Sequence, residues 1–301
     1  MNAYFRQTAA VVLLSLAIWG CSTSKVAKES LSLKDNALTA SSSGDYQMAV
    51  QSWTSYFDSQ IRKNLPVEVT DYARAAADAY ILGNEQLTLS WYDQARQSGY
   101  DGADMHVAFM HIFRKQNNLS RELTALQGLK DNFPEVAAEH KVNSRLFGIY
   151  MEIDKVKALE QWESVPAPER NTEPYLSDYF ILCKQFDYKE IADSLAAELL
   201  KLNDNHIPAL EWMAEKYYWQ AEKNYQSEME KYNRNRTHVQ YTFLINELKK
   251  ISADFRRSRD YFDRLWAQEK SPRYAAFLAN IYSRLDNPDR AYHFRKLSES
   301  E

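Results

Sequence analysis

The chain has 301 residues, of which 45% are hydrophobic and 26% are charged, so it can bury a large core or a stack of small units and is not typical of a disordered protein. Its 7 glycines and 8 prolines are few for this length, which disfavours an all-β chain with many tight turns and favours long helices. The net charge of −4 is too small to steer nucleic acid or a strongly basic partner to the surface.

The first 20 residues have the pattern of a secretory signal. Arg6 provides a positive start, and residues 9–19 form an apolar run that is short for a membrane span. The run ends at a glycine followed by Cys21, a junction that resembles the bacterial lipoprotein box. The resemblance implies that Cys21 carries lipid as the first residue of the mature protein, that residues 21–30 form a polar tether, and that Ser22 favours the outer membrane. The alternatives are an ordinary signal peptide with an incidental cysteine and an uncleaved anchor.

Two helical hairpins are predicted next, over residues 31–61 and 71–99. In each of them a helix with small residues ends at a glycine, Gly44 or Gly83, because glycine adopts the left-handed backbone conformation that closes a helix. A second helix with an apolar stripe follows and can lie back against the first. The residues that form these faces are Ala37, Ala49 and Trp53 in the first hairpin and Ala75, Ala76, Ala79, Leu87, Trp91 and Ala95 in the second.

This pattern resembles the tetratricopeptide repeat (TPR), in which small residues in one helix, a glycine at the turn, and an aromatic pair and an alanine in the next helix recur with a period near 34. The second hairpin matches the family at Ala76, Gly83, Tyr92 and Ala95 and departs from it at Thr88. The resemblance implies an all-α, right-handed TPR-like solenoid of about six to seven helical hairpins over residues 31–301. An unrelated helical bundle is the competing architecture.

Three further hairpins are predicted, with turns at Asn117, near Asp154 and at Asp187. Asn117 lies 34 residues after Gly83, which is the period of the repeat family. Pro134 falls where that family places a terminating proline. The approximate ranges of the three hairpins are 103–134, 139–165 and 172–203.

An enlarged hairpin is predicted over about residues 208–268. Apolar spacing continues without a helix breaker over residues 210–235, far longer than a repeat helix, and a second long helix follows over about residues 238–268. We expect the far ends of this pair to project beyond the stack. A last hairpin of ordinary size opens at Pro272 and turns at residues 286–288.

The sequence contains no local signature of catalysis, such as a glycine-rich phosphate loop, a serine elbow or cysteines paired at metal spacing. His106 and His111 point about 140° apart on a helix, so they do not form the pair that a zinc site needs. Cys183 lies in an apolar helix and is interpreted as a core residue, with a redox thiol as the alternative. We therefore predict that the chain is not an enzyme and holds no metal and no cofactor.

Residues 231–264 contain nine basic and four acidic residues, with aromatic residues between them. The favoured interpretation is a solvated helix face. Contact with anionic lipid head groups or with an acidic partner is the alternative. Because an exported protein meets little nucleic acid, no nucleic-acid partner is expected.

In TPR proteins the first helix of each hairpin lines a concave groove. Transfer of these positions by the resemblance gives eight candidate binding residues, namely Tyr80, His111, Arg114, Lys115, Phe147, Tyr150, Phe180 and Lys184. Aromatic residues beside cations suit an extended peptide. Ordinary packing between repeats is the alternative for each of them.

Together these features predict a lipid-anchored TPR scaffold in the bacterial envelope, at the outer membrane. Its partners would be envelope proteins of an outer-membrane assembly, secretion or motility complex, or an extended peptide in the groove, and its membrane contact would be the lipid on Cys21. The alternative function is a surface lipoprotein that captures a ligand, such as a glycan, through exposed aromatic residues.

Overall fold

The computed structural model describes residues 31–299, and all regular structure in this part of the chain is helical. The predicted signal peptide (residues 1–20), the lipidation site Cys21 and the tether (residues 21–30) lie outside the described residues. The chain divides into two compact units, with the boundary between residues 149 and 150. Among the described helices, none is both long enough and apolar enough to cross a membrane.

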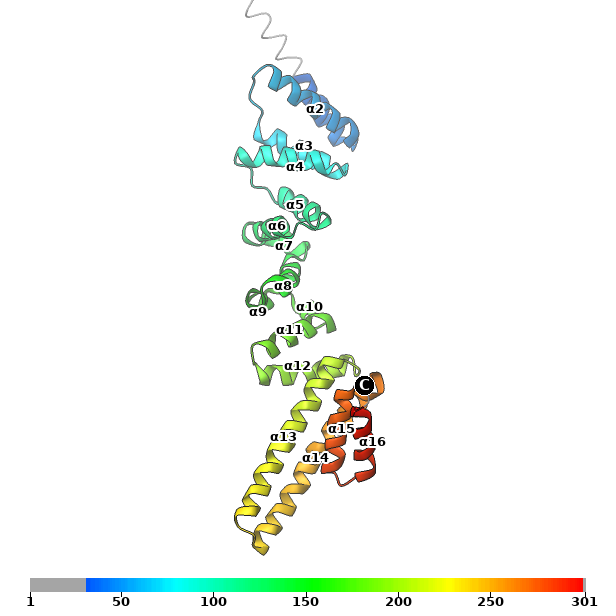
Figure 1. Ribbon diagram of the computed structural model, residues 1–301. Coiled ribbons are helices and arrows are strands. Elements are labelled where there is room, and N and C mark those ends of the chain that lie inside the picture. Colours follow the sequence, from blue (N-terminus) through cyan, green and yellow to red (C-terminus); the bar gives the residue numbers. More distant parts are fainter. Residues whose placement is uncertain (1–30, 300–301) are drawn as a thin grey trace, which may run out of the picture. The chain divides into compact units, whose positions relative to one another are not determined.

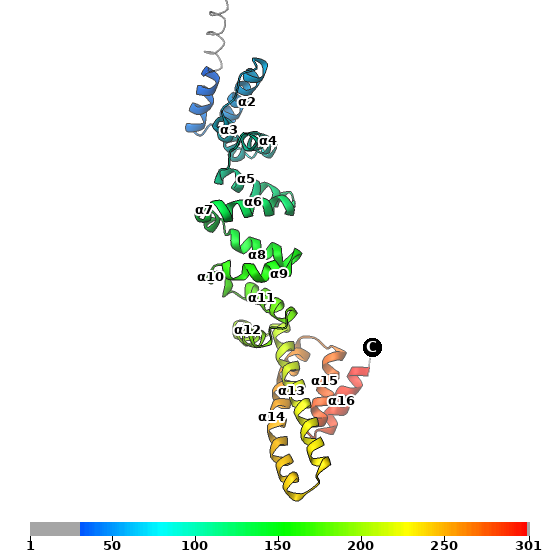
Figure 2. The same ribbon diagram turned by 90° about the vertical axis from the view of Figure 1, so that its left-hand side faces the viewer.

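The N-terminal unit consists of short helices that follow one another through tight turns (Figures 1 and 2). Its helices are residues 31–42, α2 (Tyr46–Arg62), α3 (Val69–Ile81), α4 (Glu85–Gln97), α5 (Ala103–Lys115), α6 (Leu119–Asn132) and α7 (Pro134–Glu139). The boundary between the units falls within α8 (Val142–Ile153).

The C-terminal unit begins with short helices and ends with much longer ones (Figure 1). Its helices after α8 are α9 (Lys155–Gln161), the 3₁₀ turn η1 (Trp162–Ser164), α10 (Ala167–Arg170), α11 (Glu173–Gln185), α12 (Lys189–Leu202), α13 (Ile207–Arg234), α14 (His238–Gln268), α15 (Pro272–Arg284) and α16 (Pro288–Glu299).

This order confirms the predicted all-α, TPR-like hairpin architecture. Within the described residues the helices follow as seven consecutive pairs: residues 31–42 with α2, then α3–α4, α5–α6, α8–α9, α11–α12, α13–α14 and α15–α16. The short elements α7, η1 and α10 were not predicted. Pro134 opens α7 as its first residue rather than only ending a repeat, because the first turn of a helix does not need the N–H that proline lacks. The handedness of the superhelix stays a prediction.

Five of the seven hairpin turns in residues 31–299 share one local design. The residue two positions before the second helix has a positive φ, as at Gly83 (φ 79°), Asn117 (φ 53°) and Asp187 (φ 59°), whereas the turns before α9 and α14 contain no such residue. Glycine, asparagine and aspartate tolerate this left-handed conformation better than other residues. In several turns the next residue also caps the second helix, since the Asn84 side chain accepts the N–H of Leu87. Local sequence therefore positions the turns.

Small residues bring the helices of a hairpin together as predicted. Ala75, Ala76 and Ala79 on α3 and Ala95 on α4 are completely buried. Trp91 is also buried, and its ring meets Phe57 of the preceding hairpin at a centroid distance of 5.4 Å. The second hairpin therefore covers part of its apolar face with a residue of the first hairpin.

A buried carboxylate joins the first two hairpins. Asp78 on α3 accepts hydrogen bonds from the Trp53 Nε1–H at 2.8 Å and from the Ser41 hydroxyl at 2.7 Å. Asp78 and Trp53 are both buried, so neither group could find water if its partner were removed. This pair sets the contact between α2 and α3.

Replacing Asp78 tests this contact. We expect Asp78→Ala to lower the free energy of unfolding by about 2 kcal/mol, because the buried Trp53 N–H loses its acceptor. Urea titration followed by circular dichroism measures the change. The matched control is Asp58→Ala on the exposed side of α2, which should stay within about 0.5 kcal/mol of wild type. Equal effects of the two variants would contradict the role of Asp78.

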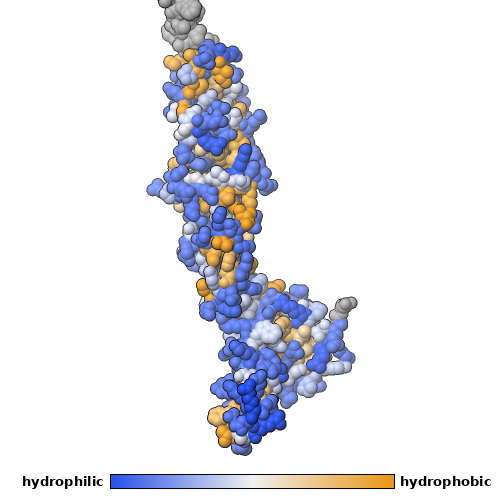
Figure 3. All heavy atoms as spheres, turned by 60° about the vertical axis from the view of Figure 1, so that its left-hand side comes forward, coloured by the Kyte–Doolittle hydropathy of each residue, from blue (hydrophilic) through white to orange (hydrophobic). Residues whose placement is uncertain are grey.

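The last four helices share one apolar core. Residues of α13 (Ala214, Tyr218), α14 (Phe262) and α15 (Leu278) are buried together in it. The Ser258 hydroxyl on α14 donates to the Ala214 carbonyl oxygen on α13 at 2.8 Å, so the two long helices are tied together. Their far end carries exposed hydrophobic side chains next to hydrophilic ones (Figure 3), and the predicted enlarged hairpin is confirmed in α13 and α14.

Candidate functional site

The eight residues predicted to line a groove are divided between the two units. The N-terminal unit holds Tyr80, His111, Arg114, Lys115 and Phe147, and the C-terminal unit holds Tyr150, Phe180 and Lys184. The structure therefore does not place them in one described site, and each unit has to be considered by itself.

Three of the eight predictions are corrected by burial. Phe147 and Phe180 have no exposed surface, and Tyr150 is 7% exposed. Phe180 packs in a core with Leu176 and Ala196 and meets the Trp212 ring edge-on at 6.0 Å. These aromatic side chains fill the space between helices, so they cannot contact a ligand on the surface.

Three of the remaining residues meet around a small pocket in the N-terminal unit. The Tyr80 hydroxyl lies 2.5 Å from His111 Nδ1, and the two rings are stacked. Lys115 is paired with Glu85 at 2.6 Å. The pocket that Tyr80, His111 and Lys115 line measures about 140 Å³, which is small for an organic ligand. Arg114 is exposed and is not among its lining residues.

The surroundings of the His111 ring favour its neutral form. Burial lowers the pKa of His111, and the nearby His140 and Arg114 lower this pKa further because positive charges repel one another. A neutral ring can accept the Tyr80 hydroxyl proton at Nδ1, whereas an imidazolium cannot.

An NMR titration of the imidazole protons tests this arrangement. We expect the pKa of His111 to lie below that of a histidine in an unstructured peptide, which is about 6.5. His140→Gln should raise the pKa of His111, because it removes a neighbouring group that becomes positive at low pH. A pKa of His111 above the peptide value would contradict the structure.

A larger pocket lies entirely in the C-terminal unit. Its volume is about 640 Å³, which is in the range of organic ligand sites. The end of α11, the start of α12, one face of α13 and the start of α15 form its wall. The lining residues are Lys184, Lys189, Asp193, Glu211, Trp212, Glu215, Lys216, Trp219 and Arg273. Of the predicted groove residues, Lys184 is the one that this pocket contains.

The carboxylates of this pocket form hydrogen bonds and ion pairs with neighbouring side chains of the same pocket. Asp193 accepts the Trp212 Nε1–H at 2.8 Å and forms an ion pair with Lys216 at 2.6 Å. Arg273 pairs with Glu211 at 2.9 Å and also with Glu215. These contacts therefore hold the pocket wall in place, and each of its three carboxylates is engaged in an ion pair, with Arg273 shared between Glu211 and Glu215.

Lys184 and Trp219 are the lining residues best placed to contact a ligand, because the first has no carboxylate partner among the described residues and the second is largely exposed. The Lys184 ammonium lies 5.3 Å from the centre of the Phe180 ring and 5.7 Å from that of Trp212, and among the described residues no carboxylate pairs with it. Trp219 is 57% exposed, and Tyr218 and Phe277 hold its ring edge-on. A cation and a fixed aromatic face thus line one cavity.

The sequence interpretation missed Trp212, Trp219 and Arg273 as site residues. The spacing of residues 212, 216 and 219 places them on one face of a helix, and this signal was present in the sequence. The sequence analysis did not single out this face, because nothing local indicates which side of a long helix meets the next hairpin.

The described residues do not assemble a recognisable catalytic centre. Cys183 is completely buried in the core, as predicted, and burial raises the pKa of its thiol. No group of three or more metal-binding side chains occurs in the described part of the chain. The predictions that the protein is not an enzyme and needs no cofactor stay predictions.

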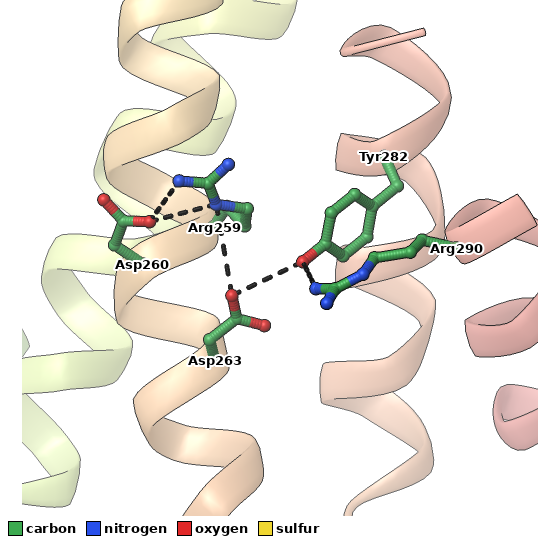
Figure 4. Close-up of polar contacts among 5 residues, drawn as sticks. All are labelled: Arg259, Asp260, Asp263, Tyr282 and Arg290. Atoms are coloured by element: carbon green, nitrogen blue, oxygen red, sulfur yellow. Dashed lines mark hydrogen bonds and ion pairs between the residues drawn. The ribbon is translucent and has the colours of Figure 1, made fainter. Parts of the chain in front are cut away.

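A polar cluster lies between α14, α15 and α16 (Figure 4). Arg290 donates to the Tyr282 hydroxyl at 2.6 Å, and this hydroxyl donates to Asp263 at 3.4 Å. Arg259 binds Asp260 on the same helix. Burial raises the pKa of Asp263, but the carboxylate faces two arginines. The cluster fastens the last hairpin to α14.

Comparison with known proteins finds solved structures that are similar to this chain at low sequence identity. No family model and no curated sequence matches it. Similar solved structures include one described as a protein-binding protein from Bacteroides ovatus, with 14% identity, a TM-score of 0.44 and coverage of 77% of this chain and 100% of that chain.

Two other similar structures are named as TPR proteins. The one from Parabacteroides merdae has 12% identity, a TM-score of 0.38 and coverage of 90% of this chain and 93% of that chain. The one from Bacteroides fragilis has 13% identity, a TM-score of 0.33 and coverage of 88% and 98%. At these values the likeness assigns no partner or activity to this chain.

Proposed function

We propose that this protein is a non-enzymatic TPR-like scaffold of the bacterial envelope, anchored by lipid on Cys21, whose C-terminal pocket binds an extended segment of a partner protein. The observation that supports a binding role best is this pocket, in which Trp219 offers an exposed aromatic face and Lys184 an unpaired cation. The proposed location in the bacterial envelope rests on the sequence of residues 1–30.

The chemistry of the pocket favours a peptide with an apolar residue next to an acidic one. The apolar side chain would lie against Trp219 and be removed from water, which contributes most of the affinity at a hot spot. The acidic side chain would meet Lys184, and Lys189 lies on the same wall. Because the pocket's own carboxylates are already paired, they would repel such a peptide only weakly.

Selection from a displayed peptide library tests this role. We expect selected peptides to combine an apolar or aromatic residue with Asp or Glu, and Trp219→Ala to weaken their binding by about 2 kcal/mol, as at a hot spot. Lys184→Ala should weaken acidic peptides more than peptides with the acid replaced by amide. Calorimetry with synthetic peptides measures both effects.

Tyr292→Ala is the matched control, because Tyr292 is an exposed aromatic residue on α16 that does not line the pocket. Loss of binding in this control, or peptides whose affinity does not depend on Trp219, would contradict the assignment of the site.

The second candidate function is capture of a glycan. The exposed indole of Trp219 favours it, because a flat apolar face can also cover the face of a sugar ring. Retention on a polysaccharide column that requires Trp219, together with failure to select any peptide, would support this function over the scaffold.

Lipid attachment has its own test in cells. We expect the wild-type chain to incorporate radiolabelled palmitate and to sediment with membranes, since several acyl chains hold a protein stably on a bilayer. Cys21→Ala should lose the label, whereas Cys183→Ala should keep it. A chain that carries no label with Cys21 intact would overturn the proposed anchor and leave the pocket unaffected.

A further inference from the structure

The short helix α7 borders an apolar cavity in the N-terminal unit. The cavity measures about 390 Å³, which is within the range of small-molecule sites. Its lining residues include Ala77 and Tyr80 of α3, Val107 of α5, Val136 of α7 and His140, the residue that directly follows α7. Helix α7 therefore forms one wall of this cavity.

Few contacts hold α7 in place. It has six residues, of which Ala137 is the buried one, and no side chain caps its first turn. Lys141, two residues after its end, has a positive φ of 54°, a conformation that costs free energy in a residue other than glycine. A helix this short is not stable by itself, so its position depends on its side-chain contacts with neighbouring helices.

One of these contacts joins two histidines. The rings of His140 and of His111 on α5 meet nearly edge to face, with centroids 5.5 Å apart. Nδ1 of His111 also lies within hydrogen-bond distance of the Tyr80 hydroxyl on α3. Two neutral imidazoles can pack in this way, whereas two imidazolium ions at this distance repel each other.

No carboxylate of the described residues offsets such a repulsion by pairing with either imidazole. Glu85, which lines the small pocket with His111, already binds Lys115. Asp104, which lines the larger cavity with His140, accepts hydrogen bonds from the hydroxyls of two tyrosines. The acidic groups that face the two histidines are therefore engaged elsewhere.

The other charged groups near this contact lie on α5 and around α7. Arg114 on α5 adds positive charge beside His111, and together with burial and His140 it lowers the pKa of His111. Glu135 and Glu139 of α7 and Lys141 after it are exposed, where water and salt screen their charges. Acid therefore raises the positive charge at the contact between α5 and α7 without a paired negative charge.

We propose that α7 is an acid-sensitive lid over the cavity, released from α5 when the pair of His111 and His140 is protonated. Release separates the two imidazoles, so the open state binds protons more readily than the closed state. The closed state is then fully stable above the pH at which a free histidine titrates, about 6.5, and loses stability as the pH falls below this value. This lid is independent of the pocket in the C-terminal unit.

Amide hydrogen exchange followed by mass spectrometry tests the proposal, on a chain that begins at Ser22 and so keeps every described residue. The measured quantity is the protection factor of the amides of residues 137–141, which corrects for the effect of pH on intrinsic exchange. From about pH 7.5 to about pH 5, we expect wild type to lose about fivefold in this protection, the size of the repulsion between two unit charges at this distance in a largely solvated site.

The variants His140→Gln and His111→Gln should each keep wild-type protection at the higher pH and lose less than about twofold at the lower one, because one of the two charges is removed. The matched control is His293→Gln, which changes an exposed histidine on α16 and should show the wild-type loss. Circular dichroism at both pH values verifies that each chain is folded.

Three results would overturn the proposal. One is unchanged protection of α7 in wild type at the lower pH. Another is an equal loss in wild type and in the His140→Gln and His111→Gln variants. The third is a loss that is as large in α3 and α5 as in α7, because it would indicate general acid unfolding rather than release of a lid.

Discussion

A hairpin of two amphipathic helices has an apolar face that it cannot cover by itself, and the other features of this protein depend on that constraint. Within a unit, a hairpin must bury its outer apolar face against the neighbouring hairpin. The fully buried alanines of α3, such as Ala75 and Ala79, allow the neighbouring helices to approach closely. The carboxylate of Asp78 is buried at such a contact, where the indole N–H of Trp53 satisfies it. Polar groups thus align the hairpins, and apolar burial holds them together.

The candidate pocket arises where the hairpins change size. Helices α11 and α12 have 13 and 14 residues, whereas α13 has 28. A long helix packed against a short hairpin must leave part of its surface uncovered. Trp212 is still engaged by Asp193 of α12, but Trp219, two turns further along α13, is largely exposed. The same difference in helix length leaves residues 226–247, further along α13 and α14, beyond the core that these helices share with α15 and α16.

Local patterns predicted much of the fold. A residue that favours a left-handed backbone, followed by a residue that can cap a helix, indicates a turn, so the turns at Gly83 and Asn117 were predicted correctly. The enlarged hairpin was predicted because no helix-breaking residue interrupts the apolar pattern of α13. The site residues were predicted less well than the turns and helices. Phe147 and Phe180 were predicted to line a groove, yet both are buried. A rotation of the helix by one position, about 100°, is enough to exchange a groove residue for a core residue, and nothing in the local sequence sets that rotation.

The sequence by itself determined that the chain is helical, where its helices turn, and that the first thirty residues have the pattern of a lipoprotein leader, because caps, glycines and apolar periodicity act over a few neighbouring residues. Only the tertiary structure decided which aromatic residues are buried and which are available. Trp219 and Phe180 have similar apolar character, and their different exposure depends on helices that are distant in the sequence. Burial is a property of the packed neighbours and not of the residue, and for this reason the pocket became visible only in the fold.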